Sequence, residues 1–381
     1  MGGIMAEHLM VDLFSGCGGL GLGMEQAGFK VSFASDIDPK AAKTYLNNRR
    51  YLSAEQQYVG DIKVLNDNID SYRKYLENIE LVCGGPPCQG FSMANRQRII
   101  DDPRNVLYKE YLRFLAYVRP NFFVMENVSG MLNKITEILE DFETVLDGEY
   151  DVSYALINAK YFGVPQNRKR LIVIGNRVGK SSELIINNLM RCENEAVKYN
   201  LHDAIYDLPV LQPKRMKYCR NLENDDIGYF EREYEYIDTA YRTFINNGRR
   251  ISKLYNHINR YNNDRDLEIY KRLPQGADSL HESISDIMPY HNRNEVFKDK
   301  YYKLDYSDVS KTITSHMQFD CHMYIHPEQI RGLSPREAAR IQTFPDDFIF
   351  YGPQNSWYKQ IGNAVPVKLA EAIGKEIIKN L

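Results

Sequence analysis

The residues of this chain best suited to chemistry lie in the short segment Gly85–Gly90, which reads GPPCQG. Pro87 fixes its own φ at about −65° and forces Pro86 out of the helical region, so Cys88 follows a stiff turn. The preceding run Leu81–Cys83 is apolar and β-prone, which predicts a buried strand that ends at this turn. In open α/β sheets, ligands bind beyond the carboxyl ends of the strands. Cys88 is therefore a candidate nucleophile, although a free cysteine is more often a small buried hydrophobe.

A second segment, near the start of the chain, has the composition of a ligand-binding turn. The apolar run Leu9–Phe14, interrupted by one acid, leads into the glycine-rich turn Ser15–Gly23 and the helix-like Met24–Ala27. A strand, a glycine-rich turn and a helix form the first half of a nucleotide-binding βαβ unit, because only glycine lets a ligand approach the backbone closely. The spacing matches neither the G-x-G-x-x-G of dinucleotide sites nor the G-K-[ST] of triphosphate sites.

An acid at the end of the next predicted strand strengthens this interpretation. The run Lys30–Ser35 ends in Asp36, which is followed by Ile37, Asp38 and Pro39. A carboxylate at this position suits the hydroxyl pair of a ribose. A glycine-rich turn alone is weak evidence, but the turn and the acid together predict a nucleoside-containing cofactor.

Seven segments resemble, in order along the chain, the successive motifs of the DNA (cytosine-5) methyltransferases, in particular those of prokaryotic restriction-modification systems. They are Asp12–Gly19 (DLFSGCGG), Gly60–Ile62 (GDI), Gly84–Ser92 (GGPPCQGFS), Glu126–Val128 (ENV), Gln166–Arg170 (QNRKR), Arg336–Pro345 (REAARIQTFP) and Gly362–Val365 (GNAV). The resemblance runs from residue 9 to about residue 370, and seven matches in family order leave almost no room for chance. It implies an enzyme that moves a methyl group from S-adenosylmethionine to carbon 5 of a cytosine in duplex DNA.

The resemblance also implies catalytic roles. Carbon 5 of cytosine is a poor nucleophile, so the Cys88 thiolate would first add to carbon 6 and activate the ring. Glu126, which follows the apolar run Phe122–Met125, matches the residue that stabilises N3, and its pKa would have to rise in a closed pocket. Arg170 would reach the flipped cytosine and Arg168 would help to hold the site together. The alternatives are a capping or surface role for Glu126 and a solvated strand edge for the two arginines.

The cofactor implied by the resemblance is S-adenosylmethionine, with S-adenosylhomocysteine as product and without a metal. The matching positions are Phe14, Gly16, Gly18, Gly19, Asp36, Ile37, Asp61, Ile62, Pro86 and Asn363. Phe14 and Ile37 would lie against the adenine and Asp36 on the ribose. Asp61 would accept from the adenine amino group, and Pro86 would add to the binding surface. Family members often carry an aromatic residue where Ile37 stands, so here the adenine would pack on an aliphatic face.

The expected fold is an α/β, Rossmann-like, doubly wound sheet of the S-adenosylmethionine-dependent type, with a second, smaller target-recognition domain. Residues 9 to about 176 alternate strands and helices, with helical spacing over 106–118 and 135–145. We predict a discontinuous catalytic domain of residues 1–177 and 355–381 and a target-recognition domain of 178–330. Residues 331–354 would be a motif segment linking the two.

Duplex DNA is the partner that the resemblance implies, and because the target cytosine is buried in the stack it would have to be flipped out to react. The turn from Gln89 to about Arg104 is expected to close over the flipped base and to touch phosphates. Its candidate contacts are Gln89, Ser92, Arg96 and Arg98. The base-reading side chains are expected within 178–330. The net charge of −3 is an objection to DNA binding. The objection is mild, because binding needs one positive face rather than a positive protein.

Composition narrows the remaining possibilities. The six cysteines include no pair at C-x-x-C spacing, which suggests reduced thiols, and His316, Cys321, His322 and His326 fit no common zinc pattern. No apolar run is long enough to span a bilayer. A monomer acting in the cytoplasm, at the nucleoid, is the expectation, with a cognate restriction endonuclease as a possible separate partner. Two rival functions stay open: a transfer-RNA cytosine-5 methyltransferase, since one branch shares these motifs, and a catalytically silent DNA-binding regulator.

Overall fold

The structure, a computed structural model, describes residues 7–87, 107–194, 198–217, 223–224, 226–289 and 300–381. Contacts within the chain divide it into two compact units. Unit 1 comprises Met1–Phe162, Lys169–Ala196 and Ala364–Leu381, and unit 2 comprises Gly163–Arg168 and Val197–Asn363. Each unit is described by itself below.

The predicted domain boundaries differ from this division. Residues 178–196 belong to unit 1 because helix α6 (Ser182–Met190) packs on strand β6 (Asp151–Asn158) through its buried face. Residues 331–354, expected to link the domains, lie inside unit 2, as do residues 355–363, which were expected in the catalytic domain. Most of these residues are buried, and α10 (Pro335–Ile341) packs on other elements of that unit, which explains the difference.

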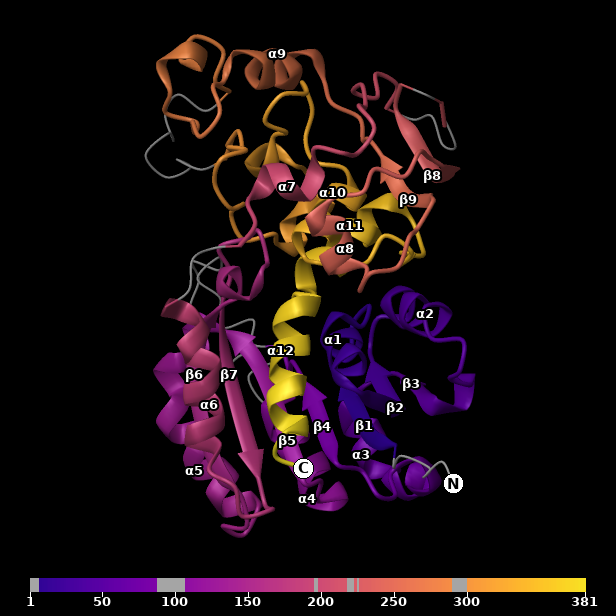
Figure 1. Cartoon of the computed structure of the whole chain (residues 1–381), viewed down its shortest axis with the longest axis vertical. Coiled ribbons are helices and arrows are strands. Elements are labelled where there is room, and N and C mark those ends of the chain that lie inside the picture. Colours follow the sequence, from indigo (N-terminus) through magenta and orange to yellow (C-terminus); the bar gives the residue numbers. More distant parts are fainter. Residues whose placement is uncertain (1–6, 88–106, 195–197, 218–222, 225, 290–299) are drawn as a thin grey trace. The chain divides into compact units, whose positions relative to one another are not determined.

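Unit 1 contains a seven-stranded sheet, which confirms the predicted α/β fold class (Figure 1). Its other strands are β1 (His8–Leu13), β2 (Phe29–Asp36), β3 (Gln57–Val59), β4 (Leu81–Gly84), β5 (Phe122–Val128) and β7 (Lys169–Asn176). The order is β3-β2-β1-β4-β5-β7-β6; the neighbours from β3 to β5 are parallel, and β7 is antiparallel to both β5 and β6. The carboxyl ends of β1, β2, β4 and β5 therefore meet at one edge.

Helices cover both faces of this sheet. On one face α1 (Gly19–Ala27) and α6 pack against the C-terminal helix α12 (Val367–Ile378), and Figure 1 shows α6 and α12 lying across the strands. On the other face lie α3 (Ile62–Asp67), α4 (Leu107–Val118) and α5 (Ile135–Val145), while α2 (Pro39–Asn47) packs beside β2 and β3. Side chains alternate along the strands: Val11 and Leu13 join the core that includes α3 to α5, whereas Asp12 points toward α1.

Unit 2 has little sheet. Strands β8 (Gly228–Glu233) and β9 (Lys253–Ile258) form an antiparallel pair. The helices are α7 (Leu201–Ile205), α8 (Ala240–Ile245), α9 (Asp264–Arg272), α10 (Pro335–Ile341) and α11 (Gln354–Asn363). Within the ranges that the structure describes, no helix has both the length and the hydropathy needed to cross a membrane, and no group of three potential metal ligands comes together.

Candidate active site

The turn that leads to Cys88 is tied to the end of the neighbouring strand. The side-chain amide of Asn127, at the end of β5, donates to the carbonyl oxygen of Pro86 over 2.8 Å, and both residues are buried. Pro87 is exposed and is the last described residue before a gap that ends at Leu107. Cys88 itself lies outside the described residues, as do Gln89, Ser92, Arg96 and Arg98, so their predicted roles stay predictions.

Glu126 and Arg170 meet beside this turn. The Arg170 Nε lies 2.8 Å from the Glu126 Oε1, because β7 runs antiparallel to β5 with Arg170 opposite Val128. A Cβ at Gly85 would lie 3.1 Å from the Glu126 Oε2, so that carboxylate reaches back over the start of the turn. Burial lowers the pKa of Arg170 below its ordinary value, and the Glu126 charge opposes that shift. Two predicted catalytic side chains are thus neighbours in unit 1.

Arg168 has different surroundings, although only one residue separates it from Arg170. It belongs to unit 2, where its buried guanidinium donates to the carbonyl oxygens of Ile313 (2.7 Å) and Gly362 (3.3 Å). A Cβ at Gly362 would lie 2.1 Å from the carbonyl carbon of Thr314, so no larger residue fits there. Arg168 therefore fastens the predicted Gly362 motif to the segment around Ile313, which favours a supporting role over substrate contact.

The glycine-rich turn is fixed by backbone contacts at the ends of β1 and β2. The Ser15 amide donates to the Ser35 carbonyl (2.9 Å) and the Gly16 amide to the Asp36 Oδ2 (2.7 Å). The other Asp36 carboxylate oxygen accepts from the Asp38 amide, also at 2.7 Å. Gly16 and Gly18 have φ values of 55° and 97°, a left-handed region that glycine adopts without strain. Asp36 is thereby held at the rim of the turn.

These residues fit a nucleoside cofactor. A Cβ at Gly16 would meet nothing within 4 Å, so the turn is open on that side. The buried Ser15 Oγ has no hydrogen-bond partner among the described residues. Ile37 exposes 70% of its surface, and Phe14 is half-buried against the core. An open turn, an aromatic and an aliphatic face, an anchored carboxylate and an unsatisfied hydroxyl form a suitable set for a ribose and an adenine.

Three of the predicted cofactor residues have additional or different surroundings. The Asp61 Oδ1 caps helix α3 by accepting from the Lys63 amide (2.9 Å), which leaves only part of its carboxylate for a ligand. The Ile62 side chain is buried in the core that includes α3 and α4, so it offers a cofactor its backbone rather than its side chain. Asn363 is the exposed last residue of α11 in unit 2.

A buried charge cluster under the glycine-rich turn was missed by the sequence analysis. The Arg49 Nη2 donates to the Gly18 carbonyl (3.1 Å) and its Nε to Glu25 (2.8 Å), and its guanidinium lies 3.7 Å from the centre of the Tyr45 ring. Burial raises the pKa of Asp12 to about 7, and the Arg49 charge opposes that shift. The acid interrupting the apolar run of β1 was the available signal, but its partners lie too far along the chain to be paired by pattern.

The predicted motif Arg336–Pro345 forms part of the framework of unit 2. Ser334 and Glu337 form a capping box at the start of α10, and Arg331 binds the Glu337 carboxylate with two donors at 2.7 and 2.6 Å. Arg336 donates through all three nitrogens to the carbonyls of Tyr255, Pro345 and Phe348. The motif thus fastens α10 to β9 and to its own following turn.

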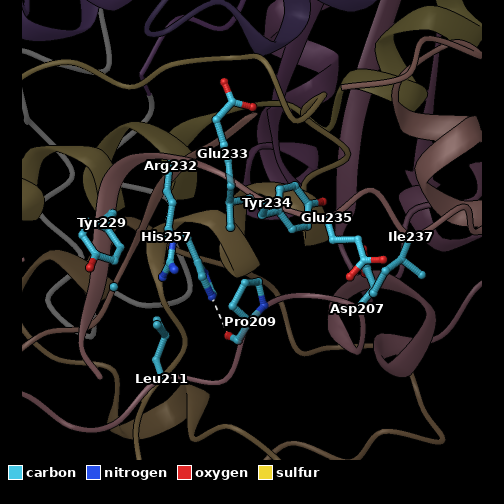
Figure 2. Close-up of a pocket in the computed structure, with 12 residues that line it drawn as sticks. Asp207, Pro209, Leu211, Tyr229, Arg232, Glu233, Tyr234, Glu235, Ile237 and His257 are labelled. Carbon is cyan, nitrogen blue, oxygen red and sulfur yellow. Dashed lines mark hydrogen bonds between the residues drawn. The ribbon is translucent and has the colours of Figure 1, made fainter. Parts of the chain in front are cut away.

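A hollow of about 430 Å³ next to β8 and β9, drawn in Figure 2, has a mainly apolar lining that includes Pro209, Leu211 and Ile237. The Nε2 of its His257 donates to the Pro209 carbonyl (2.8 Å), and the Nδ1 accepts from the Ser334 hydroxyl (2.9 Å). Burial lowers the His257 pKa to about 4, so the ring is neutral at pH 7. This histidine is a framework group, and the hollow has no arrangement that suggests catalysis.

A family profile described as C-5 cytosine-specific DNA methylase matches residues 9–379. The chain belongs to this family. The family assignment made from the motifs is thus confirmed, and the methylase is a DNA (cytosine-5-)-methyltransferase.

Named relatives and solved structures agree with this assignment. The methylase is 33% identical to the type II methyltransferase M1.HphI of Haemophilus parahaemolyticus, over 97% of this chain and 86% of that protein. It is 30% identical to M.DdeI of Desulfomicrobium norvegicum, over 97% and 88%. A putative DNA modification methyltransferase encoded within an E. coli prophage superposes with a TM-score of 0.74 at 26% identity, covering 97% of this chain and 98% of that one. The S. pombe Dnmt2 methyltransferase shares the fold, with a TM-score of 0.56 at 16% identity over 98% and 99%.

Proposed function

We propose that this methylase transfers a methyl group from S-adenosylmethionine to carbon 5 of a cytosine flipped out of a specific duplex DNA sequence, through a covalent bond between Cys88 and carbon 6. The observation that carries the proposal is the Glu126–Arg170 pair beside the Gly85–Pro87 turn. This arrangement supports a site in which a nucleophile, a proton donor and a fixed cation converge on one base.

The first chemical step adds the Cys88 thiolate to carbon 6 of the cytosine, and the ring electrons move toward carbon 5 and N3. Glu126 holds a proton or a strong hydrogen bond at N3, which stabilises the added charge. Arg170 fixes the position of the Glu126 carboxylate and approaches the base from the β7 side. The bond between Asn127 and Pro86 holds the turn that places Cys88.

S-adenosylmethionine supplies an electrophilic methyl group to carbon 5 when it is bound. Phe14 and Ile37 would flank the adenine, Asp36 would accept from the ribose hydroxyls, and the turn through Gly16, Gly18 and Gly19 would admit the cofactor to the backbone. After transfer, water takes the proton on carbon 5, the electrons of that bond re-form the ring double bond, and the bond from carbon 6 to Cys88 breaks with its electrons returning to the sulfur as thiolate. Cytosine is thereby released with one additional methyl group.

We assign recognition of the DNA sequence to the 197–330 part of the segment predicted for it, which belongs to unit 2. The names of the relatives, type II methyltransferases, support a role as the modification enzyme of a restriction-modification system, with a separate cognate endonuclease.

A methyl-transfer assay tests the proposed function. Purified protein is incubated with S-adenosylmethionine carrying a labelled methyl group and with either plasmid DNA or transfer RNA. We expect label in DNA, as 5-methylcytosine after nucleoside digestion, and bisulfite sequencing of the plasmid should reveal one short recurring sequence. Label in transfer RNA alone would establish the RNA alternative, and failure to bind S-adenosylmethionine in calorimetry would support the silent regulator.

A further inference from the structure

Phe319 is an exposed aromatic residue held between buried neighbours. Its side chain exposes 68% of its surface, whereas Met317 and Cys321, two residues away on each side, are buried. It follows a short 3-10 helix, Ser315–Gln318, and its amide donates to the His316 carbonyl over 2.9 Å. The His316 ring lies 5.5 Å from the Phe319 ring. The ring is thus presented by an ordered turn with anchored ends.

Arg260 fixes the main chain of this turn. Its Nη1 donates to the Met317 carbonyl and its Nη2 to the Phe319 carbonyl, both at 2.7 Å. The guanidinium also lies 5.4 Å from the centre of the buried Tyr358 ring. A planar guanidinium with two short bonds to the same turn leaves it little freedom. The exposure of Phe319 therefore belongs to a defined conformation of the turn.

A polar hollow of about 410 Å³ shares Phe319 as a lining residue. Its lining includes the cationic side chains of Lys214, Lys217 and Arg260, four side-chain amides, among them Asn262, and two acids. The buried Asn262 Oδ1 has no hydrogen-bond partner within the described residues, although its Nδ2 donates to the Tyr270 hydroxyl at 3.3 Å. Both acids have partners: Asp266 accepts from the Tyr301 hydroxyl at 2.9 Å and Asp320 from the His322 amide at 3.1 Å.

We propose that Phe319 and this hollow bind the duplex DNA that the methylase modifies, with Phe319 packed against a base and Lys214 and Lys217 facing phosphates. The inference rests on the proposed function and names side chains of unit 2 that take part in it. Apolar side chains such as Phe can insert between the base steps of a duplex, lysines pair with phosphates, and asparagine or glutamine amides bond to base edges. An exposed aromatic, a group of cations and a group of amides side by side match these three needs.

The test starts from the cognate duplex, identified by bisulfite sequencing as described above. Affinities of wild-type protein, Phe319→Ala and Phe319→Leu are measured for this duplex and for a scrambled duplex of equal length, with S-adenosylhomocysteine present. Removing the stacking of an aromatic ring on a base lowers affinity by about 5- to 100-fold. We expect such a decrease for Phe319→Ala on the cognate duplex, a smaller one for Phe319→Leu, and little change on the scrambled duplex. Leu280→Ala is the control, because it removes another exposed apolar side chain of unit 2 (50% exposed); this variant should bind like wild type.

Substituting Lys214 or Lys217 should change DNA binding in a different way from substituting Phe319. Lys214→Gln and Lys217→Gln should weaken binding to both duplexes similarly. If each substitution removes one pairing with a phosphate, it should reduce the salt dependence, the slope of log K against log salt, by about 1. Lys253→Gln is the matched control, because Lys253 pairs with Glu231 (2.7 Å) and lies outside the lining of the hollow.

Two results would overturn the inference. One is wild-type affinity of Phe319→Ala for the cognate duplex, which would leave this surface for a protein partner. The other is an equal decrease on both duplexes with an unchanged circular dichroism spectrum, which would exclude contact with a specific base. Failure of the wild-type protein to methylate any DNA would instead contradict the proposed function itself, so the two failures are distinguishable.

Discussion

Asp12 in unit 1 and Asp346 in unit 2 are both fully buried, yet their pKa values move in opposite directions. Burial raises the pKa of Asp12 to about 7, and the Arg49 charge does not outweigh that effect. Burial acts on Asp346 in the same sense, but the charges of Arg340, Arg336 and Arg242 outweigh it and lower the pKa to about 2. The nearby positive charge does not offset the effect of burial on the pKa of Asp12, whereas the nearby arginines more than offset it for Asp346.

The difference reflects how each unit is held together. Unit 1 has seven paired strands, so backbone hydrogen bonds and the apolar core provide its framework. Unit 2 has only the β8–β9 pair as a sheet in its described part, and buried arginines connect its loops and short helices. Arg340, for example, reaches Asp346 at 2.8 Å and Asp207 at 2.5 Å. The buried arginines of unit 2 thus hold its fold together, while the Glu126–Arg170 pair of unit 1 is proposed to take part in chemistry.

The largest effect that this comparison predicts is on chemistry in unit 1. Cys88→Ala should abolish methyl transfer and leave S-adenosylmethionine binding near the wild-type level, because other residues are proposed to form the cofactor site. Transfer is measured with labelled methyl groups and binding by calorimetry. Cys192→Ala, at a partly exposed cysteine outside the proposed sites, should keep its activity. Retained turnover in Cys88→Ala would remove Cys88 from the mechanism.

Glu126→Gln should lower kcat by about 10²- to 10⁴-fold, because the amide keeps the shape but cannot supply a proton. Affinity for duplex DNA should stay close to wild type. Single-turnover kinetics and a gel-shift titration measure the two quantities. A kcat within a few-fold of wild type would mean that the pair with Arg170 is structural, and unit 1 would then resemble unit 2 in its use of charge.

Arg340→Met should destabilise the protein by about 3–5 kcal/mol, because it leaves the buried carboxylates of Asp346 and Asp207 with less compensating charge. Chemical denaturation followed by fluorescence measures the change in the free energy of unfolding. Arg113→Met provides the control, since Arg113 pairs with Asp67 at the surface of unit 1 and should change stability little. Equal destabilisation by both substitutions would mean that the network in unit 2 is not its framework.

The smallest effect is a pH dependence. Because the folded pKa of Asp12 lies above its ordinary value, folding retains a proton there, and stability contributed by this group falls as pH rises from about 4 to about 7. Asp346 acts oppositely, and its contribution is lost only as pH falls toward about 2. As pH rises from 5 to 8, the Tm of Asp12→Asn should therefore decrease less than the Tm of the wild-type protein. An identical change in both proteins would contradict the raised pKa of Asp12.

Local patterns predicted much of unit 1. Helix α5 has the predicted bounds, 135–145, and the described part of α4, Leu107–Val118, lies within the predicted 106–118, because strongly periodic helices can be identified from their own residues. The apolar run before Gly84 is a strand that ends at that residue, and the run before Glu126 is a strand that continues through the motif to Val128. The closeness of Glu126 and Arg170 was expected only from the family resemblance. The antiparallel pairing of β5 with β7, which brings them together, cannot be deduced from the sequence of either strand alone.

Other features depend on contacts that sequence spacing does not reveal. Arg49 joins Glu25 and Gly18 from 24 and 31 residues away, and nothing in its local sequence distinguishes it from a surface arginine. The boundary near residue 196 follows from the packing of α6 on β6, whereas the prediction relied on a change in composition near residue 178. Ile62 was placed on the cofactor by its motif, but the start of α3 buries its side chain in the core.

The central claim is that Cys88 bonds to carbon 6 of the target cytosine, and one measurement tests it most directly. The wild-type protein is incubated with S-adenosylmethionine and a cognate duplex containing 5-fluorocytosine at the target position, where fluorine cannot leave as the carbon 5 proton does. After digestion, peptide mass spectrometry should find the methylated fluorocytosine on Cys88. The absence of an adduct on a duplex whose unmodified form is methylated, or an adduct on another cysteine such as Cys83, would contradict the account.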